Sequence, residues 1–299
     1  MKEQNACIVY ISSRKKCIRH SLKSLWDNFN HKHRYPVYVH YFDDIYDDES
    51  FRQEIREDNS QDVRFISVPY KTPENIREEE LFYNRKELWY ARTSFPINRK
   101  GYLHMCNFTS NMYGYPDTNL TQYDFILTHD DESGYDSKVD INPFSILREQ
   151  NKLFGAYKTG QRLKNGRPHQ GHLDTRVGLW QLTKRFLELK NLTPKNEKLA
   201  SLLTDPAANN NFHLLDWCDT YVIDTKMFKS QLWKEWIGFV NKSGGIYKYR
   251  WGDNEIISLF VHMIQDEIYD FNLVDSGVHN QGKFRHLQDI APGVKDLTK

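Results

Sequence analysis

The chain has 299 residues, of which 39% are hydrophobic, 27% are charged and 14% are aromatic. Disordered chains are poor in aromatic residues, so this composition excludes wholesale disorder and favours a folded protein with a sizeable core. The 41 basic and 40 acidic residues leave a formal charge of +1, which disfavours a general nucleic-acid binder.

The amino-terminal region predicts neither a membrane anchor nor a secretory leader. No apolar run in the chain approaches the length of about 18 residues that a transmembrane helix needs. Residues 1–5 are polar and lead directly into a strand-like run, without the charged and apolar regions of a signal peptide. The four cysteines form no CxxC pair and are expected to be reduced. These features predict a cytoplasmic protein.

The first third of the chain alternates between predicted strands and helices. Short apolar runs at residues 6–12, 36–42 and 63–68 predict three strands, the first of them buried. Apolar residues at helical spacing from Ile18 to Phe29 predict an amphipathic helix of about four turns, and residues 43–56 predict an acidic loop followed by an exposed helix. This order favours a parallel sheet with helices on its faces.

The rest of the chain continues the pattern less regularly. Residues 74–92 predict a surface helical hairpin, and residues 159–172 predict a loop rich in glycine and basic residues. Further strands are predicted at 123–129, 153–157 and 267–271, and further helices at 102–113, 177–189, 228–240 and from residue 252 onward. No linker is long enough to divide the chain, so we expect one domain over residues 1–299.

An acidic cluster follows the predicted strand at 123–129. In open parallel sheets, ligands bind outside the carboxyl ends of the strands, and Asp130, Asp131 and Glu132 stand at such an end. Two carboxylates one residue apart can chelate a hard divalent cation. Such a cation would stabilise the charge of a departing nucleoside diphosphate. Acidic clusters are common in this chain, so a solvated turn is the alternative.

Ser12–Lys15 follows the first predicted strand. This segment offers hydroxyls, backbone amides and positive charge to an anion, although an ordinary turn is the commoner meaning of such a sequence. No P-loop and no dinucleotide-binding glycine motif occurs, which disfavours those two classes.

Other candidate residues lie later in the chain. Asp253 begins a predicted helix, where it either caps the helix or lines a sugar pocket with Trp251. Asp216 and Asp219 lie in an otherwise apolar segment, where one carboxylate could act as base or nucleophile or be a hydrogen-bonded structural residue. His279 either completes a metal shell or is solvated.

Several strings, taken together, resemble the fungal α-1,2-mannosyltransferases of glycosyltransferase family 15. Residues 101–110 (GYLHMCNFTS) are similar to the family pattern Tyr-x-x-Met-Cys-Arg-Phe-x-Ser-Gly, and residues 244–253 (GGIYKYRWGD) are similar to Gly-Gly-Phe-Tyr-x-x-Arg-Trp-Gly-Asp. Residues 21–40 resemble the amino-terminal part of the family. Asp130–Glu132 stands where the family has Glu-Pro-Asp. The matches occur in the family's order and span residues 6–280.

This resemblance implies a GT-A fold, a nucleotide-sugar donor (GDP-mannose in the family) and Mn²⁺ at the acidic motif. It places Asp130 and Glu132 at the two acids of that motif. Ser13 and Arg14 fall where the family has a donor-contacting arginine.

The sequence also departs from the family pattern. Ile257 occupies the position of a metal-binding histidine, so His279 becomes the candidate third ligand. The family's asparagine and glutamate in Trp-Ser-Asn-Phe-Glu are replaced by Asp219 and Tyr221. The arginine of Met-Cys-Arg-Phe is replaced by Asn107, a lost charge that bears on donor choice.

We therefore expect a GT-A-like α/β domain, with a mostly parallel sheet flanked by helices, that acts as a metal-assisted glycosyltransferase. The donor is a GDP- or UDP-sugar, the acceptor is a glycan hydroxyl, and the cofactor is Mn²⁺ or Mg²⁺. We expect no nucleic-acid partner. Three groups of residues receive roles: Asp130, Glu132 and His279 for the metal, Ser13, Arg14 and Trp251 for the donor, and Asp219 and Asp253 for the reacting sugar. The alternatives are a non-catalytic glycan- or nucleotide-binding protein and a nucleotidyl- or phosphotransferase.

Overall fold

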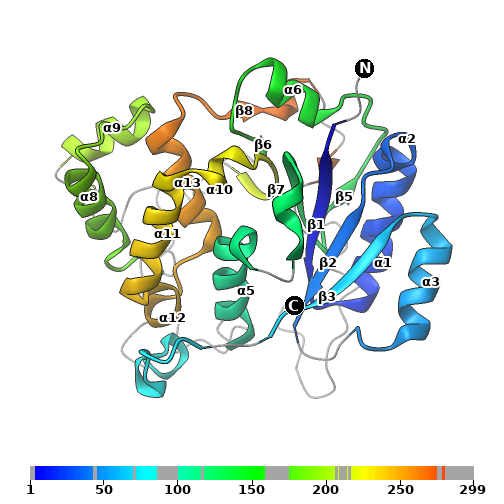
Figure 1. Cartoon of the computed structure of the whole chain (residues 1–299), viewed down its shortest axis with the longest axis horizontal. Coiled ribbons are helices and arrows are strands. Elements are labelled where there is room, and N and C mark those ends of the chain that lie inside the picture. The colour runs from blue at the N-terminus through cyan, green and yellow to red at the C-terminus, as the bar shows by residue number, and fades with distance from the viewer. Residues whose placement is uncertain are drawn as a thin grey trace, which may run out of the picture.

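The fold is centred on one large β-sheet (Figure 1). The computed structural model describes residues 4–42, 46–69, 72–85, 100–115, 118–158, 175–205, 208, 214, 217–274 and 278–279. Within them, a seven-stranded sheet has the order β3-β2-β1-β4-β7-β6-β8. Its strands are β1 (Ala6–Ser12), β2 (Val37–Tyr41), β3 (Val63–Ser67), β4 (Phe125–Asp130), β6 (Phe154–Lys158), β7 (Trp217–Asp224) and β8 (Tyr269–Asp270). A second, two-stranded sheet joins β5 (Gly134–Tyr135) to β9 (Val278–His279).

Most neighbouring strands of the large sheet are parallel. β1 pairs in parallel with β2 and β4, β2 with β3, and β6 with β8. β7 runs antiparallel to both of its neighbours, β4 and β6. The expected mostly parallel α/β sheet is therefore confirmed.

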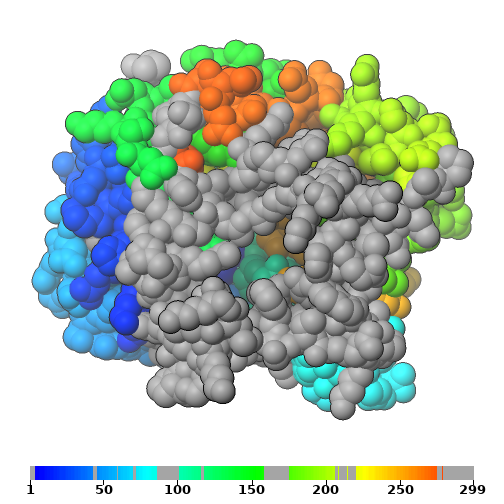
Figure 2. All heavy atoms as spheres, turned by 180° about the vertical axis from the view of Figure 1, so that it is seen from behind, coloured from blue at the N-terminus to red at the C-terminus, as the bar shows by residue number. Residues whose placement is uncertain are grey.

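Helices cover both faces of the sheet, with the early helices α1 to α3 on one side and α5 and α8 to α13 on the other (Figure 1). From behind, the amino-terminal helices and the pair α8–α9 again lie at opposite ends of the molecule (Figure 2). The helices are α1 (Lys15–Leu25), α2 (His31–His33), α3 (Glu49–Asn59), α5 (Lys100–Asn111), α6 (Pro143–Glu149), α8 (Leu179–Lys190), α9 (Glu197–Thr204), α10 (Lys226–Lys229), α11 (Gln231–Ser243), α12 (Gly245–Tyr249) and α13 (Asp253–Ile264).

The residues of β1 explain why helices pack on both faces of this sheet. Its alternate residues belong to two different cores: Cys7 and Val9 pack with the helices of the carboxyl-terminal half, whereas Ile8 and Tyr10 pack with α1 and α3. A strand that is buried on both faces reads as a continuous apolar run, as residues 6–12 do.

The structure corrects one sequence expectation about secondary structure and adds the strand β7 and the helices α6 and α9, which the sequence did not predict. The described part of the expected hairpin at 74–92 contains only the short 3₁₀ turns η2 (Glu78–Glu80) and η3 (Phe82–Asn84), so that prediction is wrong there. The expected loop at 159–172 lies outside the described residues.

Within the part of the chain that the structure describes, every helix is too short or too polar to cross a lipid bilayer. The expected cytoplasmic location and the single-domain division stay predictions.

Candidate functional site

The candidate site begins where β1 and β4 end. These two strands are adjacent and parallel, with Ile11 opposite Asp130, so their carboxyl ends lie at the same edge of the sheet. The segment after β1 therefore meets the acidic residues at the end of β4, as the parallel order predicts.

Arg14 is the centre of this meeting. Its Nη2 lies 3.3 Å from Oδ1 of Asp130 and also contacts Asp131, while its Nη1 lies 2.9 Å from Oε2 of Glu132. Asp131 and Glu132 are buried, whereas the side chain of Asp130 is 33% exposed. One guanidinium faces three carboxylates, so these four residues together carry a net charge of two negative units.

Asp131 is the most firmly held member of the cluster. Its Oδ2 accepts a hydrogen bond of 2.7 Å from the Ser12 hydroxyl and one of 3.1 Å from the Ser13 backbone N–H. The Ser12 oxygen also lies 2.6 Å from the Tyr46 hydroxyl. Three charged or hydrogen-bonding partners therefore fix Asp131 between the two strand ends, and its role is to position the loop that carries Arg14.

The negative charge of the cluster affects its neighbours. Burial, reinforced by the Asp131 carboxylate, raises the pKa of the Cys17 thiol to about 11. Burial alone would lower the pKa of the Arg14 guanidinium. The three neighbouring carboxylates have the larger, opposite effect and hold this pKa above its ordinary value. Arg14 therefore stays charged, and the region favours the approach of cations.

The carboxylates of this cluster are candidate ligands for a divalent metal. Among the described residues, no three histidine, cysteine or carboxylate side chains are grouped closely enough to hold a metal ion by themselves. Mg²⁺ is usually held by one or two carboxylates together with substrate phosphates, and Mn²⁺ also prefers oxygen ligands. Asp130 and Glu132 supply two such carboxylates in a cluster of net charge minus two. The donor set therefore fits a divalent ion that completes its coordination with phosphate and water.

His279 lies close to this motif along the second sheet. It is the residue of β9 that pairs with Gly134, two positions beyond Glu132. The position of the His279 backbone is thus compatible with the expected third ligand. Its side chain is outside the described part of the structure, so the role stays a prediction.

β7 brings Asp219 to the same edge. The antiparallel register pairs Thr128 with Tyr221, and the Thr220 hydroxyl lies 3.2 Å from Nδ1 of His129. The pairing ends at Thr128 and Tyr221, and Asp130 and Asp219 follow two residues further toward the same end of the two strands. The side chain of Asp219 is not described, and Asp216 lies outside the described residues.

The segment Arg250–Asp253 is fixed by its tryptophan. Trp251 is buried, and its Nε1 donates a hydrogen bond of 2.8 Å to the Val177 carbonyl. A Cβ added at Gly245 would lie 2.3 Å from the indole ring, so a glycine is needed for this close approach. In this structure Trp251 anchors the turn, and its expected contact with the donor stays a prediction.

Asp253 is the first residue of α13, and the residue at the N-cap position is Gly252. The alternative that Asp253 caps the helix is therefore wrong by one residue. Asp253 is buried and lies beside Cys106 of α5, where burial and the Asp253 carboxylate hold the pKa of the thiol well above its ordinary value. The Arg250 guanidinium stacks 4.3 Å from the centre of the Tyr102 ring.

The sequence model of the family described as glycolipid 2-alpha-mannosyltransferase matches residues 1–281. The chain belongs to this family. It is 25% identical over 259 residues to O-glycoside alpha-1,2-mannosyltransferase omh1 of Schizosaccharomyces pombe, covering 84% of this chain and 63% of that protein. It is 24% identical over 263 residues to alpha-1,2 mannosyltransferase KTR1 of Saccharomyces cerevisiae, covering 84% and 62%. The chain thus spans about three fifths of the length of these relatives.

Two solved structures have the same fold. Core-mannan synthase A from Aspergillus fumigatus, in its Mn/GDP form, superposes with a TM-score of 0.72 at 19% identity, covering 89% of this chain and 71% of that one. The mannosyltransferase Ktr4p from S. cerevisiae in complex with GDP superposes with a TM-score of 0.71 at 18% identity, covering 88% and 68%. The expected GT-A-like fold is confirmed, as is the family resemblance.

For this family member, the structure adds one residue that the sequence analysis did not single out. Tyr46 supports Ser12, which holds Asp131 and belongs to the segment Ser12–Lys15 considered above. Ile257 is fully buried in α13, so this position offers no metal ligand. Asn107 lines a groove, described below, whose lining includes no residue of the acidic cluster.

Proposed function

We propose that this chain transfers a sugar, with mannose the first candidate, from a GDP-sugar donor to a hydroxyl of a glycan. The observation that supports the proposal best is the Arg14–carboxylate cluster at the carboxyl edge of the sheet, in a chain that belongs to a mannosyltransferase family. The relatives named as alpha-1,2-mannosyltransferases support the sugar, and the GDP-bound structures support the nucleotide.

Asp130 and Glu132 would hold Mn²⁺ or Mg²⁺ in this proposal. When bound, the ion supplies positive charge that stabilises the departing diphosphate. Arg14 provides a second positive charge at the same edge, where its side chain is 24% exposed, and a guanidinium suits a phosphate group. Ser13 has an exposed side chain beside it that can donate a hydrogen bond to the donor.

The acceptor hydroxyl must lose its proton as the new glycosidic bond forms, and a nearby carboxylate can accept it. Asp219 and Asp253 are the candidates. The register of β7 supports Asp219, because its backbone lies at the same sheet edge as Asp130. The burial of Asp253 beside Cys106 supports a carboxylate in a poorly solvated setting.

The direct test is an assay of the purified chain with GDP-mannose, other GDP-sugars and UDP-sugars, with Mn²⁺ and α-1,2-mannobiose as acceptor. Mass spectrometry should show the acceptor enlarged by one sugar unit and the release of nucleoside diphosphate. Transfer of a phosphate or nucleotidyl group instead would establish the phosphotransferase alternative and overturn the proposal.

A non-catalytic binding protein is the second candidate, and the buried Ile257 at the expected ligand position favours it. A transferase hydrolyses its donor slowly when no acceptor is present. Binding of GDP-mannose with neither hydrolysis nor transfer would therefore establish the binding protein.

A further inference from the structure

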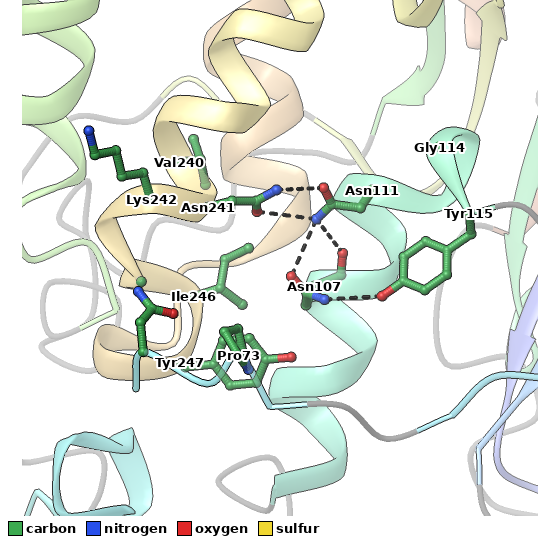
Figure 3. A pocket seen from close by; sticks show the side chains of 12 residues that line it. Pro73, Asn107, Asn111, Gly114, Tyr115, Val240, Asn241, Lys242, Ile246 and Tyr247 are labelled. Carbon is green, nitrogen blue, oxygen red and sulfur yellow. Dashed lines mark hydrogen bonds between the residues drawn. The ribbon is translucent and has the colours of Figure 1, made fainter. Parts of the chain in front are cut away.

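A groove of about 560 Å³ lies between α5, the end of α11 and α12 (Figure 3). Residues after β3 and after α5 complete its wall. None of the residues assigned above to the metal, the donor or the reacting sugar lines it.

The lining of the groove is dominated by amides and aromatic rings. Four of its residues are asparagines and two are tyrosines: Asn75, Asn107, Asn111, Asn241, Tyr115 and Tyr247. The described lining includes no carboxylate. Its single cationic residue, Lys242, points away from Asn107, Asn111 and Asn241 (Figure 3). This lining suits neither a metal ion nor a multiply charged anion.

Three of the amides form one hydrogen-bonded network across two helices (Figure 3). Nδ2 of Asn241 donates to Oδ1 of Asn111 over 2.8 Å, and Nδ2 of Asn111 lies 3.3 Å from Oδ1 of Asn241. Nδ2 of Asn111 donates to the Asn107 backbone carbonyl over 2.9 Å and also lies 3.3 Å from Oδ1 of Asn107, whose own Nδ2 donates to the Tyr115 hydroxyl over 3.3 Å. The network therefore fixes the three amides in defined orientations.

The network leaves hydrogen-bonding capacity for a ligand. An amide group has two N–H donors and an oxygen with two lone pairs. Within the described residues, Asn107 and Asn241 each use one N–H in this network, and the oxygen of each accepts at most one hydrogen bond, because the two N–H groups of Asn111 also serve the Asn107 backbone carbonyl. One donor and one acceptor site therefore remain on each side chain, and a hydroxyl group, which both donates and accepts, matches this pair.

The groove is on a different face of α5 from the candidate transfer site. Tyr102 and Cys106 contact the segment that contains Arg250 and Asp253. Asn107 lies one residue beyond Cys106, and Asn111 lies five residues beyond it. On a helix of 3.6 residues per turn, these spacings rotate the two side chains away from that of Cys106 by about 100° and about 140°. A ligand in the groove would therefore be bound separately from the donor.

We infer that this groove binds a neutral oligosaccharide at a site separate from the transfer site. The fixed amides hydrogen-bond the sugar hydroxyls, and the ring of Tyr115, which points toward Asn107, packs against the C–H face of a sugar ring (Figure 3). The inference goes beyond the proposed reaction, because binding in the groove requires neither a metal ion nor a nucleotide.

Ile246 provides a local probe, because it lines the groove, whereas Ile257 lies in α13 outside the lining. The experiment is a titration of ¹³C-methyl-isoleucine-labelled protein with α-1,2-mannobiose and, separately, with chitotriose, followed by NMR. Without metal or nucleotide, at least one of the two sugars should shift the Ile246 methyl signal saturably. The double variant Asn111→Leu/Asn241→Leu should weaken this binding at least tenfold.

Two controls keep the test independent of folding and of transfer. Gln231→Ala removes an exposed amide at the other end of α11 and should leave the affinity unchanged. Asp130→Asn/Glu132→Gln should also leave it unchanged, even if transfer is lost. The inference is overturned if neither sugar shifts Ile246, or if the Asn111/Asn241 variant is folded by its NMR spectrum and binds as tightly as the wild type.

Discussion

The Ser12 hydroxyl donates a hydrogen bond of 2.7 Å to Asp131, a residue 119 positions further along the chain. This bond joins the end of β1 to the end of β4. It places Arg14, two residues after Ser12, against the acidic cluster. Asp131, which lies between the candidate metal ligands Asp130 and Glu132 in the sequence, thus holds the two strand ends together.

Replacing Asp131 by asparagine should therefore destabilise the protein. Removing one partner of a fully buried ion pair costs about 3 to 5 kcal/mol. Because Arg14 is 24% exposed and keeps two other carboxylates, we expect a loss of roughly 2 kcal/mol in the free energy of unfolding, measured by urea denaturation. Asp27→Asn, which removes an exposed partner of Lys23, is the control and should cost about 0.5 kcal/mol or less. Equal stability of the two variants would contradict the role given to Asp131.

The contact between Gly245 and Trp251 predicts a steric effect. A methyl group at Gly245 would lie 2.3 Å from the indole ring, so Gly245→Ala should cost about 1 to 3 kcal/mol through overpacking. Gly238→Ala in α11 is the matched control, because a methyl group there meets no atom within 4 Å and alanine is the better helix former. Thermal denaturation should show a lower Tm for the first variant and an unchanged or higher Tm for the second. A Gly245→Ala protein as stable as the wild type would refute the steric argument.

Two buried histidines predict a dependence of stability on pH. Burial lowers the pKa of His40 and of His129 from 6.5 to about 3. Below pH 6.5 the unfolded chain binds protons that the folded chain does not. The free energy of unfolding should therefore be steady above pH 7 and fall as the pH drops from 6.5 toward 3, by up to about 1.4 kcal/mol per pH unit for each histidine.

Urea denaturation at several pH values between 5 and 8 measures this slope. His40→Phe keeps an aromatic ring against Phe108, which lies 4.9 Å from the His40 ring, and should reduce the slope below pH 6.5 by about one proton. An unchanged slope in this variant would show that His40 does not contribute to the pH dependence of the free energy of unfolding.

Much of the fold could be predicted from the sequence, because β1, β2 and β4 are buried along almost their whole length. Residues 6–12 are a continuous apolar run and form β1 with those bounds. β7 was not predicted, since residues 217–224 mix aspartate and threonine with apolar residues. These polar groups are accommodated by tertiary contacts, such as the bond between Thr220 and His129, that no local pattern reveals.

The candidate site was predictable only in part for a similar reason. The position of Asp130–Glu132 after a strand, and that of Arg14 after another, follow from the parallel order. Three other features depend on side-chain packing between distant segments and could not be predicted. These are the contacts of Arg14 with all three acids, the burial of Asp131 and the packing of Trp251 on Gly245. The roles expected for Asp219, Asp253 and His279 stay predictions.

The central claim is that Asp130 and Glu132 bind a divalent ion together with a nucleoside diphosphate. Isothermal titration of the protein with GDP, in Mn²⁺ and again in excess EDTA, tests it most directly. For the wild type and for the exposed-acid control Glu188→Gln, we predict affinity for GDP at least tenfold higher with Mn²⁺ than with EDTA. For Asp130→Asn/Glu132→Gln, we predict that this difference disappears. An equal Mn²⁺ dependence in the double variant, or none in the wild type, would contradict the account.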